Sequence, residues 1–336
     1  MATIAAPAPA ARKRRRIRPE TKLAFLYVLP AFLIMGIITF FPLLYQTWMS
    51  FTDYTLENLP PRGAPPNFVG IDNYVRILTT NLNIPNYDFG RIIVFNLFWA
   101  LSNVIIHVVL GVLIAVLLNT QGLRFRRFYR AIYILPVVIP PIIVATVWAN
   151  MFDKDNGAIN LALQGVATLL RIPPDAFQID WLRQVADPIP ALSFIPMAYF
   201  ALLVANTWLG WPLNSVVATG ALQSIPKELY EAAEIDGANA WQRFRNITIP
   251  YLRPAMLPYA IYGFVRTFNL FYLSYFMSGG GPFGRTELLV TQAFRLVTEQ
   301  RLFGVGAAFA VIMFFILLVL TLITNRVAKA TASYVD

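Results

Sequence analysis

The sequence contains no cysteine and only one histidine, His107. Without cysteine the chain forms neither disulfide bonds nor thiolate metal sites, and a single histidine excludes a histidine-rich metal site. Charged residues are also scarce, at 13% against about 25% in soluble globular chains. Hydrophobic residues make up 57%. This composition excludes a disordered chain and argues against a soluble multi-domain enzyme.

The few charged residues divide the chain into long uncharged stretches. A helix that crosses the hydrocarbon core of a bilayer needs about 20 apolar residues. Six stretches reach this length, one of them interrupted only by Arg266: 23–52, 92–123, 131–152, 188–226, 254–284 and 302–325. We therefore predict an all-α membrane protein with six transmembrane helices, the fourth at about 197–222. Pro136, Pro140 and Pro141 predict a kink or a break in the third.

The distribution of lysine and arginine predicts the orientation in the membrane. An even number of spans places both termini on one side, which then carries 17 basic residues against nine in the opposite loops. Because basic residues accumulate on the cytoplasmic side, both termini are predicted to be cytoplasmic. The net charge of +10 is therefore explained by the orientation of the chain in the membrane and by contact with membrane lipid. No nucleic acid is expected as a partner. The apolar run that follows the basic residues is too long for a signal peptide, whose apolar region has about 7–15 residues.

One outer loop carries an amphipathic pattern. Ile71, Tyr74, Val75 and Leu78 repeat at the spacing of one helical face. We expect a short helix that lies either in the outer membrane interface or packed as part of the loop.

The segment 224–254 is the cytoplasmic connection with the clearest pattern. Pro226 suits the first turn of a helix and Gly237 suits its end. Asn239 begins a second helix, with Gln242 three residues on as the partner of a capping box, and Pro250 is expected to end it. The segment is therefore predicted to form a helix-turn-helix at the cytoplasmic surface.

The first of these two helices carries an acidic residue beside small ones. Ala232 and Ala233 permit close approach of another chain, and Glu231 suits a bidentate pair with an arginine. Two interpretations remain at this point. The helix docks into a groove of a partner, or the hairpin packs on the base of the chain's own membrane domain.

Several motifs resemble those of a known family. Glu231-Ala232-Ala233, Gly237 and Ile247-x-Ile249-Pro250 resemble the EAA motif of ABC importer permeases, although that family usually has leucine where Ile249 stands. Five further segments are similar to those of maltose-type, binding-protein-dependent sugar permeases: NFVGIDNY at 67–74, NGAIN at 156–160, NTWLGWP at 206–212, ELYEAAEIDGA at 228–238 and SGGGP at 278–282. The resemblance covers roughly residues 25–325.

The resemblance implies a type I ABC importer permease in a prokaryotic inner membrane. It divides the chain into a basic cytoplasmic tail (1–22), a six-helix permease domain (23–325) with a coupling loop (224–254), and a cytoplasmic C-terminal tail (326–336). Its implied partners are a second homologous permease, two ATPase subunits, an extracytoplasmic sugar-binding protein and the sugar. The chain lacks a phosphate-binding G-x-x-x-x-G-K-[ST] motif, so no cofactor is expected on it, and ATP and magnesium are expected on the ATPases. The residues implied to contact an ATPase are Glu231, Ala232, Ala233, Asp236 and Gly237.

The resemblance also implies a sugar site, formed by Gly210, Leu213, Gly263, Arg266 and Thr267. Arg266 carries the strongest indication of a site, because a charge at bilayer depth costs at least about 2.5–3.5 kcal/mol and usually faces a cavity or a partner. The implied substrate is maltose, maltodextrin or a related di- or oligosaccharide. Another sugar, a polyol or glycerol phosphate stays open, because the polar residues differ from those of typical maltose permeases.

Two other classes of membrane protein fit less well. An ion-coupled secondary carrier needs acidic residues within its spans, and the uncharged stretches contain none. A membrane-embedded enzyme needs clustered catalytic carboxylates or histidines, and no such cluster or metal-ligand set is recognisable. His107, in the middle of the second stretch, is expected to be a packed, neutral core residue, with a proton relay as the alternative.

Overall fold

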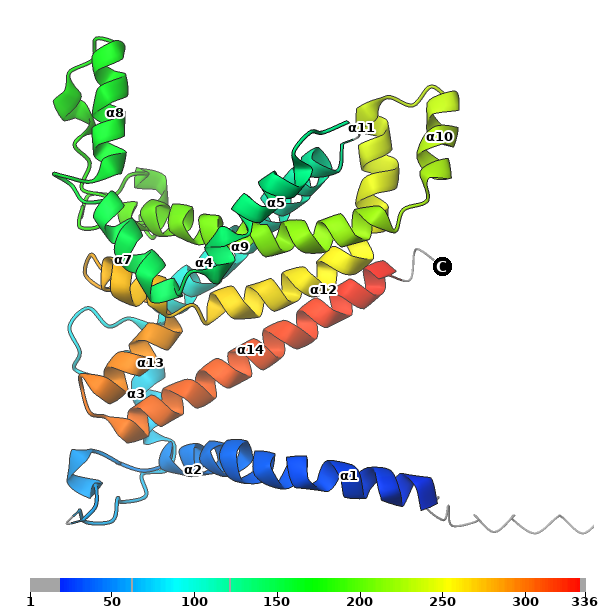
Figure 1. Ribbon diagram of the computed structural model, residues 1–336. Coiled ribbons are helices and arrows are strands. Elements are labelled where there is room, and N and C mark those ends of the chain that lie inside the picture. The colour runs from blue at the N-terminus through cyan, green and yellow to red at the C-terminus, as the bar shows by residue number, and fades with distance from the viewer. Residues whose placement is uncertain (1–18, 62, 121, 333–336) are drawn as a thin grey trace, which may run out of the picture.

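The computed structural model describes residues 19–61, 63–120 and 122–332 (Figure 1). Over these residues the chain is helical, with one isolated antiparallel bridge between Thr52 and Phe68 and no strand, which confirms the predicted all-α class. Most of the predicted tail at 1–22 lies outside the described residues. The helices of at least seven residues are α1 (Pro19–Met35), α2 (Phe41–Met49), α3 (Asp72–Leu78), α4 (Phe89–Asn119), α5 (Arg126–Tyr133), α7 (Pro141–Met151), α8 (Ala158–Leu169), α9 (Met197–Gln223), α10 (Lys227–Ile235), α12 (Ile249–Phe268), α13 (Leu289–Thr298) and α14 (Phe303–Ala332).

Shorter elements connect these helices. α6 (Leu135–Val138) and α11 (Ala240–Arg243) are single turns, and 3-10 turns occur at Leu56–Asn58, Pro174–Phe177 and Pro190–Leu192. π-helical turns occupy Gly36–Phe40, Phe244–Thr248 and Leu273–Ser278. The first of them joins α1 to α2 without a break, so that the predicted first span is one continuous helix.

Four helices of the described chain are long and apolar enough to cross a membrane: Leu23–Met49, Phe89–Asn119, Met197–Gln223 and Phe303–Arg326. A fifth span results if Arg126–Val138 and Pro141–Met151 are counted together, although they are bent by 97°. The break falls at the prolines that predicted it, because proline lacks an N–H donor and disturbs the preceding turn.

The span predicted at 254–284 does not appear as one long apolar helix. Within 254–284, α12 ends at Phe268 and a π-helical turn begins at Leu273. α12 also contains Arg253 and Arg266 as well as two internal prolines, which lower its apolar character. The structure thus gives four or five candidate spans where six were predicted.

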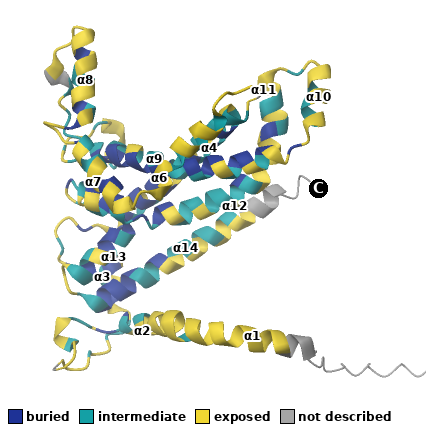
Figure 2. Ribbon diagram, viewed as in Figure 1, coloured by how far each residue is buried: buried dark blue, intermediate teal, exposed yellow. Residues whose placement is uncertain are grey.

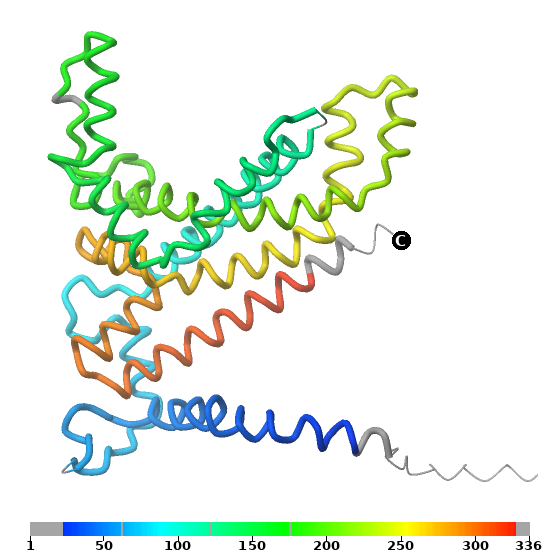
Figure 3. The backbone as a smooth tube through the Cα atoms, viewed as in Figure 1, coloured from blue at the N-terminus to red at the C-terminus, as the bar shows by residue number. Residues whose placement is uncertain are grey.

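The core of the molecule lies where α4 packs along α9 and both contact α12 (Figure 3). α9 is largely buried there, whereas α1 is exposed along its described length (Figure 2). The close approach of α4 and α9 depends on Gly111. A Cβ atom at this position would lie 2.4 Å from the Cβ of Asn214, and small residues at such crossings are typical of membrane helices.

The two ends of the long helices carry different short elements (Figure 1). α3, α8 and α13 lie at one end. α10 and α11 lie at the other, together with the start of α1 and the end of α14. α14 continues to Ala332, seven residues past the predicted boundary at 325.

The predicted helix at 71–78 is present as α3, which packs against α14. Its buried residues are Asn73 and Ile77. Of the predicted apolar positions, Ile71, Val75 and Leu78 are exposed, and only Tyr74 packs against the core cluster that contains Ile77.

Candidate functional site

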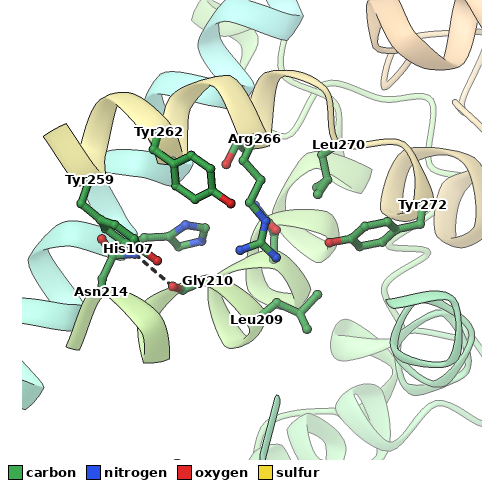
Figure 4. Close-up of a pocket in the computed structure, with 12 residues that line it drawn as sticks. His107, Leu209, Gly210, Asn214, Tyr259, Tyr262, Arg266, Leu270 and Tyr272 are labelled. Carbon is green, nitrogen blue, oxygen red and sulfur yellow. Dashed lines mark hydrogen bonds between the residues drawn. The ribbon is translucent and has the colours of Figure 1, made fainter. Parts of the chain in front are cut away.

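A small polar cavity lies between α4, α9 and α12, among the membrane-spanning helices (Figure 4). Its volume is about 30 Å³, which is room for one or two water molecules. A disaccharide would not fit into the space that this chain encloses alone. Residues of all three helices and of the turn after α12 line the cavity. They include His107 on α4; Asn206, Gly210 and Asn214 on α9; Tyr259, Tyr262, Gly263, Arg266 and Thr267 on α12; and Leu270 and Tyr272 after α12.

The wall formed by α9 depends on Gly210, the middle residue of this helix. A Cβ atom on Gly210 would lie 2.1–2.4 Å from three atoms of the His107 ring, so only glycine leaves space for the imidazole. One turn further on, the Asn214 side chain donates a hydrogen bond to the carbonyl of Gly210 at 3.0 Å. The cavity is therefore shaped by a glycine that admits a polar ring from the neighbouring helix.

The wall formed by α12 lies at the end of that helix, where Arg266 occupies the last turn. The Asn96 side chain on α4 donates to the carbonyl of Phe268 at 3.1 Å and accepts from the backbone N–H of Leu289 at 2.8 Å. The first bond satisfies a carbonyl at the end of α12, and the second satisfies an N–H at the start of α13. Irregular backbone at membrane depth is tolerated where it is buried in protein or lines a cavity, and the negative end of the helix dipole favours a cation here.

Arg266 brings a positive charge to the cavity without a counter-charge. Within the described ranges, no carboxylate lies within ion-pair distance of its guanidinium group. Figure 4 shows the guanidinium extending from α12 toward α9, with the hydroxyl of Tyr272 pointing toward it. Three tyrosines, Tyr259, Tyr262 and Tyr272, line the same space, so hydroxyl groups surround the charge.

The structure brings together four of the five predicted sugar-site residues. Gly210, Gly263, Arg266 and Thr267 all line the cavity, whereas Leu213 does not. The reason is helical spacing, because the lining residues of α9 after Gly210 continue at the four-residue step to Asn214.

Two tryptophans of α9 beside Gly210 are not among the residues that line the cavity. Trp208 contacts Trp148 and Trp211 contacts Tyr133, each pair as aromatic neighbours. His107, Asn206 and Asn214 line the cavity and were not identified as site residues from the sequence. The only local indication was that the two asparagines stand four residues before and after Gly210.

The second region of interest is the pair α10–α11, referred to below as the helix pair. Gly237 has φ +79° directly after α10, a conformation that glycine adopts without strain. The Asn239 side chain accepts from the N–H of Gln242 at 2.9 Å, and the Gln242 side chain accepts from the N–H of Asn239 at 2.8 Å. The predicted helix end and capping box are confirmed.

The second helix of the pair does not end at Pro250 as predicted. α11 continues through the π-helical turn Phe244–Thr248 directly into α12. Pro250 falls in the first turn of α12, where its missing N–H is tolerated, and the wider π-helical turn before it shifts the hydrogen-bond pattern. The helix pair is therefore continuous with the helix that carries Arg266.

The helix pair is fixed internally and on its base. Glu234 pairs with Arg243 at 3.1 Å across the two helices, and the hydroxyls of Tyr230 and Thr248 lie 2.9 Å apart. Leu229, Tyr230 and Ile247 pack against the cluster formed by α4, α9 and α12.

The outer face of the helix pair is exposed. Of the predicted coupling residues, Glu231, Ala232, Asp236 and Gly237 are exposed and Ala233 is half-buried. Ile235 is 87% exposed, and Trp241 on α11 is 65% exposed. Large exposed apolar side chains next to small ones indicate a surface for another protein.

Neither region holds groups suited to a metal. No set of three histidine, cysteine, aspartate or glutamate side chains in the described part of the chain is arranged to bind a metal ion. What the arrangement offers chemically is a polar binding surface among apolar helices and a protein-docking surface at their end.

Residues 107–333 match the family described as "Binding-protein-dependent transport system inner membrane component". The chain belongs to this family. The matched region includes every residue of the polar cavity and the whole helix pair.

Named relatives are permeases of sugar transport systems. The chain is 32% identical to the maltodextrin transport system permease protein of Streptococcus pneumoniae, covering 91% of this chain and 69% of the relative. It is 29% identical to the trehalose/maltose transport system permease protein of Thermococcus litoralis, covering 92% and 95%. The galactooligosaccharides transport system permease protein of Bacillus subtilis is 32% identical over 84% of this chain and 65% of the relative.

A solved structure shares the fold of this family member. It is a chain of the bacterial ABC transporter that imports the acidic polysaccharide alginate, with a TM-score of 0.72 at 19% identity, covering 93% of this chain and 96% of that one. The similarity extends over nearly the whole of both chains. It establishes the ABC importer permease fold and carries no information about the substrate of this chain.

Proposed function

We propose that this chain is a transmembrane permease subunit of an ATP-driven importer of maltose, maltodextrin or a related di- or oligosaccharide. The observation that carries the proposal is the continuity between the two regions described above. α9 leads from the polar cavity into α10, and α11 leads back into α12 and to Arg266. A partner that moves the helix pair would thereby act on two walls of the cavity.

The membrane arrangement follows from this proposal. α12 and the turn after it form the span predicted at 254–284, whose polar residues line a path for substrate rather than face lipid. The helix pair lies on the cytoplasmic side, together with both termini. The positions of α10, α11, the start of α1 and the end of α14 at one end of the long helices support this orientation (Figure 1).

The size of the cavity supports a paired permease. At about 30 Å³ the cavity is far below the roughly 300–1,000 Å³ typical of ligand pockets. A second, homologous permease facing α9 and α12 would complete the walls of a sugar site. An extracytoplasmic binding protein would deliver the sugar at the end where α3, α8 and α13 lie.

ATP hydrolysis belongs to two further subunits in this proposal. The exposed face of the helix pair, with Glu231, Ala232 and Ile235, docks into a cleft of an ATPase that binds ATP and magnesium. An arginine of that cleft would pair with Glu231.

The test is reconstitution of the complete complex in proteoliposomes. ATP hydrolysis and maltotriose uptake are measured with and without the binding protein. Both activities should depend on the binding protein and on maltotriose, and Glu231→Lys should abolish uptake while the chain stays in the membrane. Sugar uptake by this chain in the absence of any ATPase would refute the proposal.

Arg266 favours a second candidate, an importer of glycerol phosphate or another anionic polyol. Competition with labelled maltotriose distinguishes the two, because glycerol phosphate should compete only if the site binds anions. Replacing the residue by alanine adds a check. Loss of uptake at normal membrane levels assigns Arg266 to the substrate path, whereas loss of the protein assigns it to a structural contact.

A further inference from the structure

The imidazole of His107 is buried in the wall of the polar cavity with one nitrogen unused. The residue is 6% exposed, and its Nε2 atom has no hydrogen-bond partner in the part of the chain that the structure describes. More than nine in ten buried polar groups in native structures have a partner. The free atom therefore points to a group that binds in the cavity.

The rest of the ring is held by α9. The ring packs against this helix at Gly210, where a Cβ atom would lie 2.1–2.4 Å from three of its atoms. Gly210 lies beneath the ring without a side chain. A neutral imidazole has one donor and one acceptor nitrogen, so Nε2 is an acceptor in the tautomer that is protonated at Nδ1.

The other polar groups of the cavity define what chemistry matches this acceptor. Arg266 offers only donors, and the hydroxyls of Tyr259, Tyr262 and Tyr272 both donate and accept. A carboxylate or a fully ionised phosphate group would satisfy Arg266 but has no proton for Nε2, so the group that meets Nε2 is a hydroxyl. A sugar hydroxyl donates and accepts at once, so neighbouring hydroxyls of one neutral sugar serve both His107 and Arg266.

We propose that His107 is a substrate-binding residue, whose Nε2 accepts a hydrogen bond from a hydroxyl of the transported neutral sugar. This inference rests on the proposed function, since it assigns a contact within that transport site. It makes α4 a third wall of the site, in addition to the positions on α9 and α12 that the sequence indicated.

The experiment compares three variants in the reconstituted complex with binding protein, using maltotriose uptake as the readout. His107→Leu and His107→Phe remove the acceptor and keep an apolar side chain of similar size. His107→Gln is the matched control, because its amide oxygen reaches the region of Nε2. We expect Leu and Phe to lower the apparent affinity for maltotriose about three- to tenfold, as for loss of one neutral hydrogen bond, and Gln to restore most of it.

A series of monodeoxy maltose analogues separates substrate contact from packing. The wild-type complex should transport one analogue about three- to tenfold less well than maltose. The preference of the His107→Leu complex for maltose over that analogue should be smaller than that of the wild-type complex by the same factor. Since the binding protein is the same in both complexes, its own discrimination cancels in the comparison.

Three results would overturn the inference while leaving the proposed function intact. Unchanged uptake of maltotriose by His107→Leu would show that Nε2 contacts no substrate. Equal losses for every analogue would assign the ring to packing, and so would failure of both apolar variants to assemble. Absence of maltotriose uptake by the wild-type complex would instead refute the proposed function.

Discussion

The polar cavity buries hydrogen-bonding groups among membrane-spanning helices, whereas the helix pair exposes apolar and small side chains at the end of the same helices. His107 and Thr267 are buried in the first region. Ile235 and Trp241 are exposed in the second. Folded proteins usually bury apolar groups and expose polar ones, and each region does the reverse for one of these kinds of group. Each therefore indicates a different kind of partner.

The buried polar atoms and the exposed apolar side chains require partners of different chemistry. A buried polar atom gains from a hydrogen bond, which a small hydroxylated ligand provides. An exposed apolar side chain gains from removal of its surface from water, at about 25 cal/mol per Å², which requires the broad surface of another protein. Because α9 leads from the cavity into the helix pair and α12 leads from the helix pair back to the cavity, binding at one region can change the other.

The largest effect is expected from distorting the helix pair. Gly237→Val places a β-branched residue at φ +79°, where such residues are strained. This change should abolish uptake and release the ATPase from the purified complex. Gly122→Val is the matched control, since Gly122 has φ +81° and likewise has nothing within 4 Å of its Cβ position but lies outside the helix pair. Equal loss of uptake in both variants would contradict a specific role of the pair.

A second prediction fills the cavity. Gly263→Leu adds four carbon atoms to a space of about 30 Å³ and should block uptake without preventing assembly. Gly263→Ala is the control, because its Cβ would lie 3.8 Å from the nearest atom, a methyl of Val104, which is ordinary contact. Binding-protein-stimulated uptake and size-exclusion of the complex measure the two properties. Wild-type uptake by Gly263→Leu would place the sugar elsewhere.

The third prediction replaces glycine by alanine at Gly210, on α9, which faces α12 across the cavity. Gly210→Ala should destabilise the complex by about 1–3 kcal/mol, the usual cost of overpacking a filled site, because its Cβ would lie 2.1 Å from the His107 ring. Thermal unfolding of the purified complex measures this loss. Gly263→Ala should leave the unfolding temperature unchanged. If both alanine variants behave alike, the ring of His107 does not occupy the space over Gly210.

The sequence was most informative where structure depends on neighbouring residues. Four of the six spans predicted from the long apolar runs are present as long apolar helices, and the prolines at 136, 140 and 141 predicted the bent one. Within the helix pair, the end at Gly237 and the capping box of Asn239 and Gln242 involve residues a few positions apart. Each can therefore be predicted from the sequence without knowledge of the fold.

The missed features depend on contacts between distant segments. His107 and Gly210 are about a hundred residues apart, and only the packing of α4 on α9 reveals that one shapes the site of the other. The continuation of α11 through Pro250 was also missed, because a π-helical turn leaves no clear pattern in the sequence. Leu213 was placed in the site by resemblance, and the spacing of α9 selects Asn214 instead.

The smallest effect tests whether the cavity binds sugar through a hydroxyl on α12 as well as through the imidazole on α4. Thr267 is 5% exposed and lines the cavity one turn from Gly263. Thr267→Val keeps nearly the same volume and removes the hydroxyl, so loss of one neutral hydrogen bond should weaken uptake by about 0.5–1.5 kcal/mol. Thr267→Ser, which keeps the hydroxyl and loses a methyl group, is the control and should retain the affinity for maltotriose. If the serine variant is impaired as strongly as the valine variant, the methyl group of Thr267 matters for packing, and the hydroxyl is not a substrate contact. A normal serine variant beside a weakened valine variant would extend the hydrogen-bonding surface of the cavity to the last turn of α12.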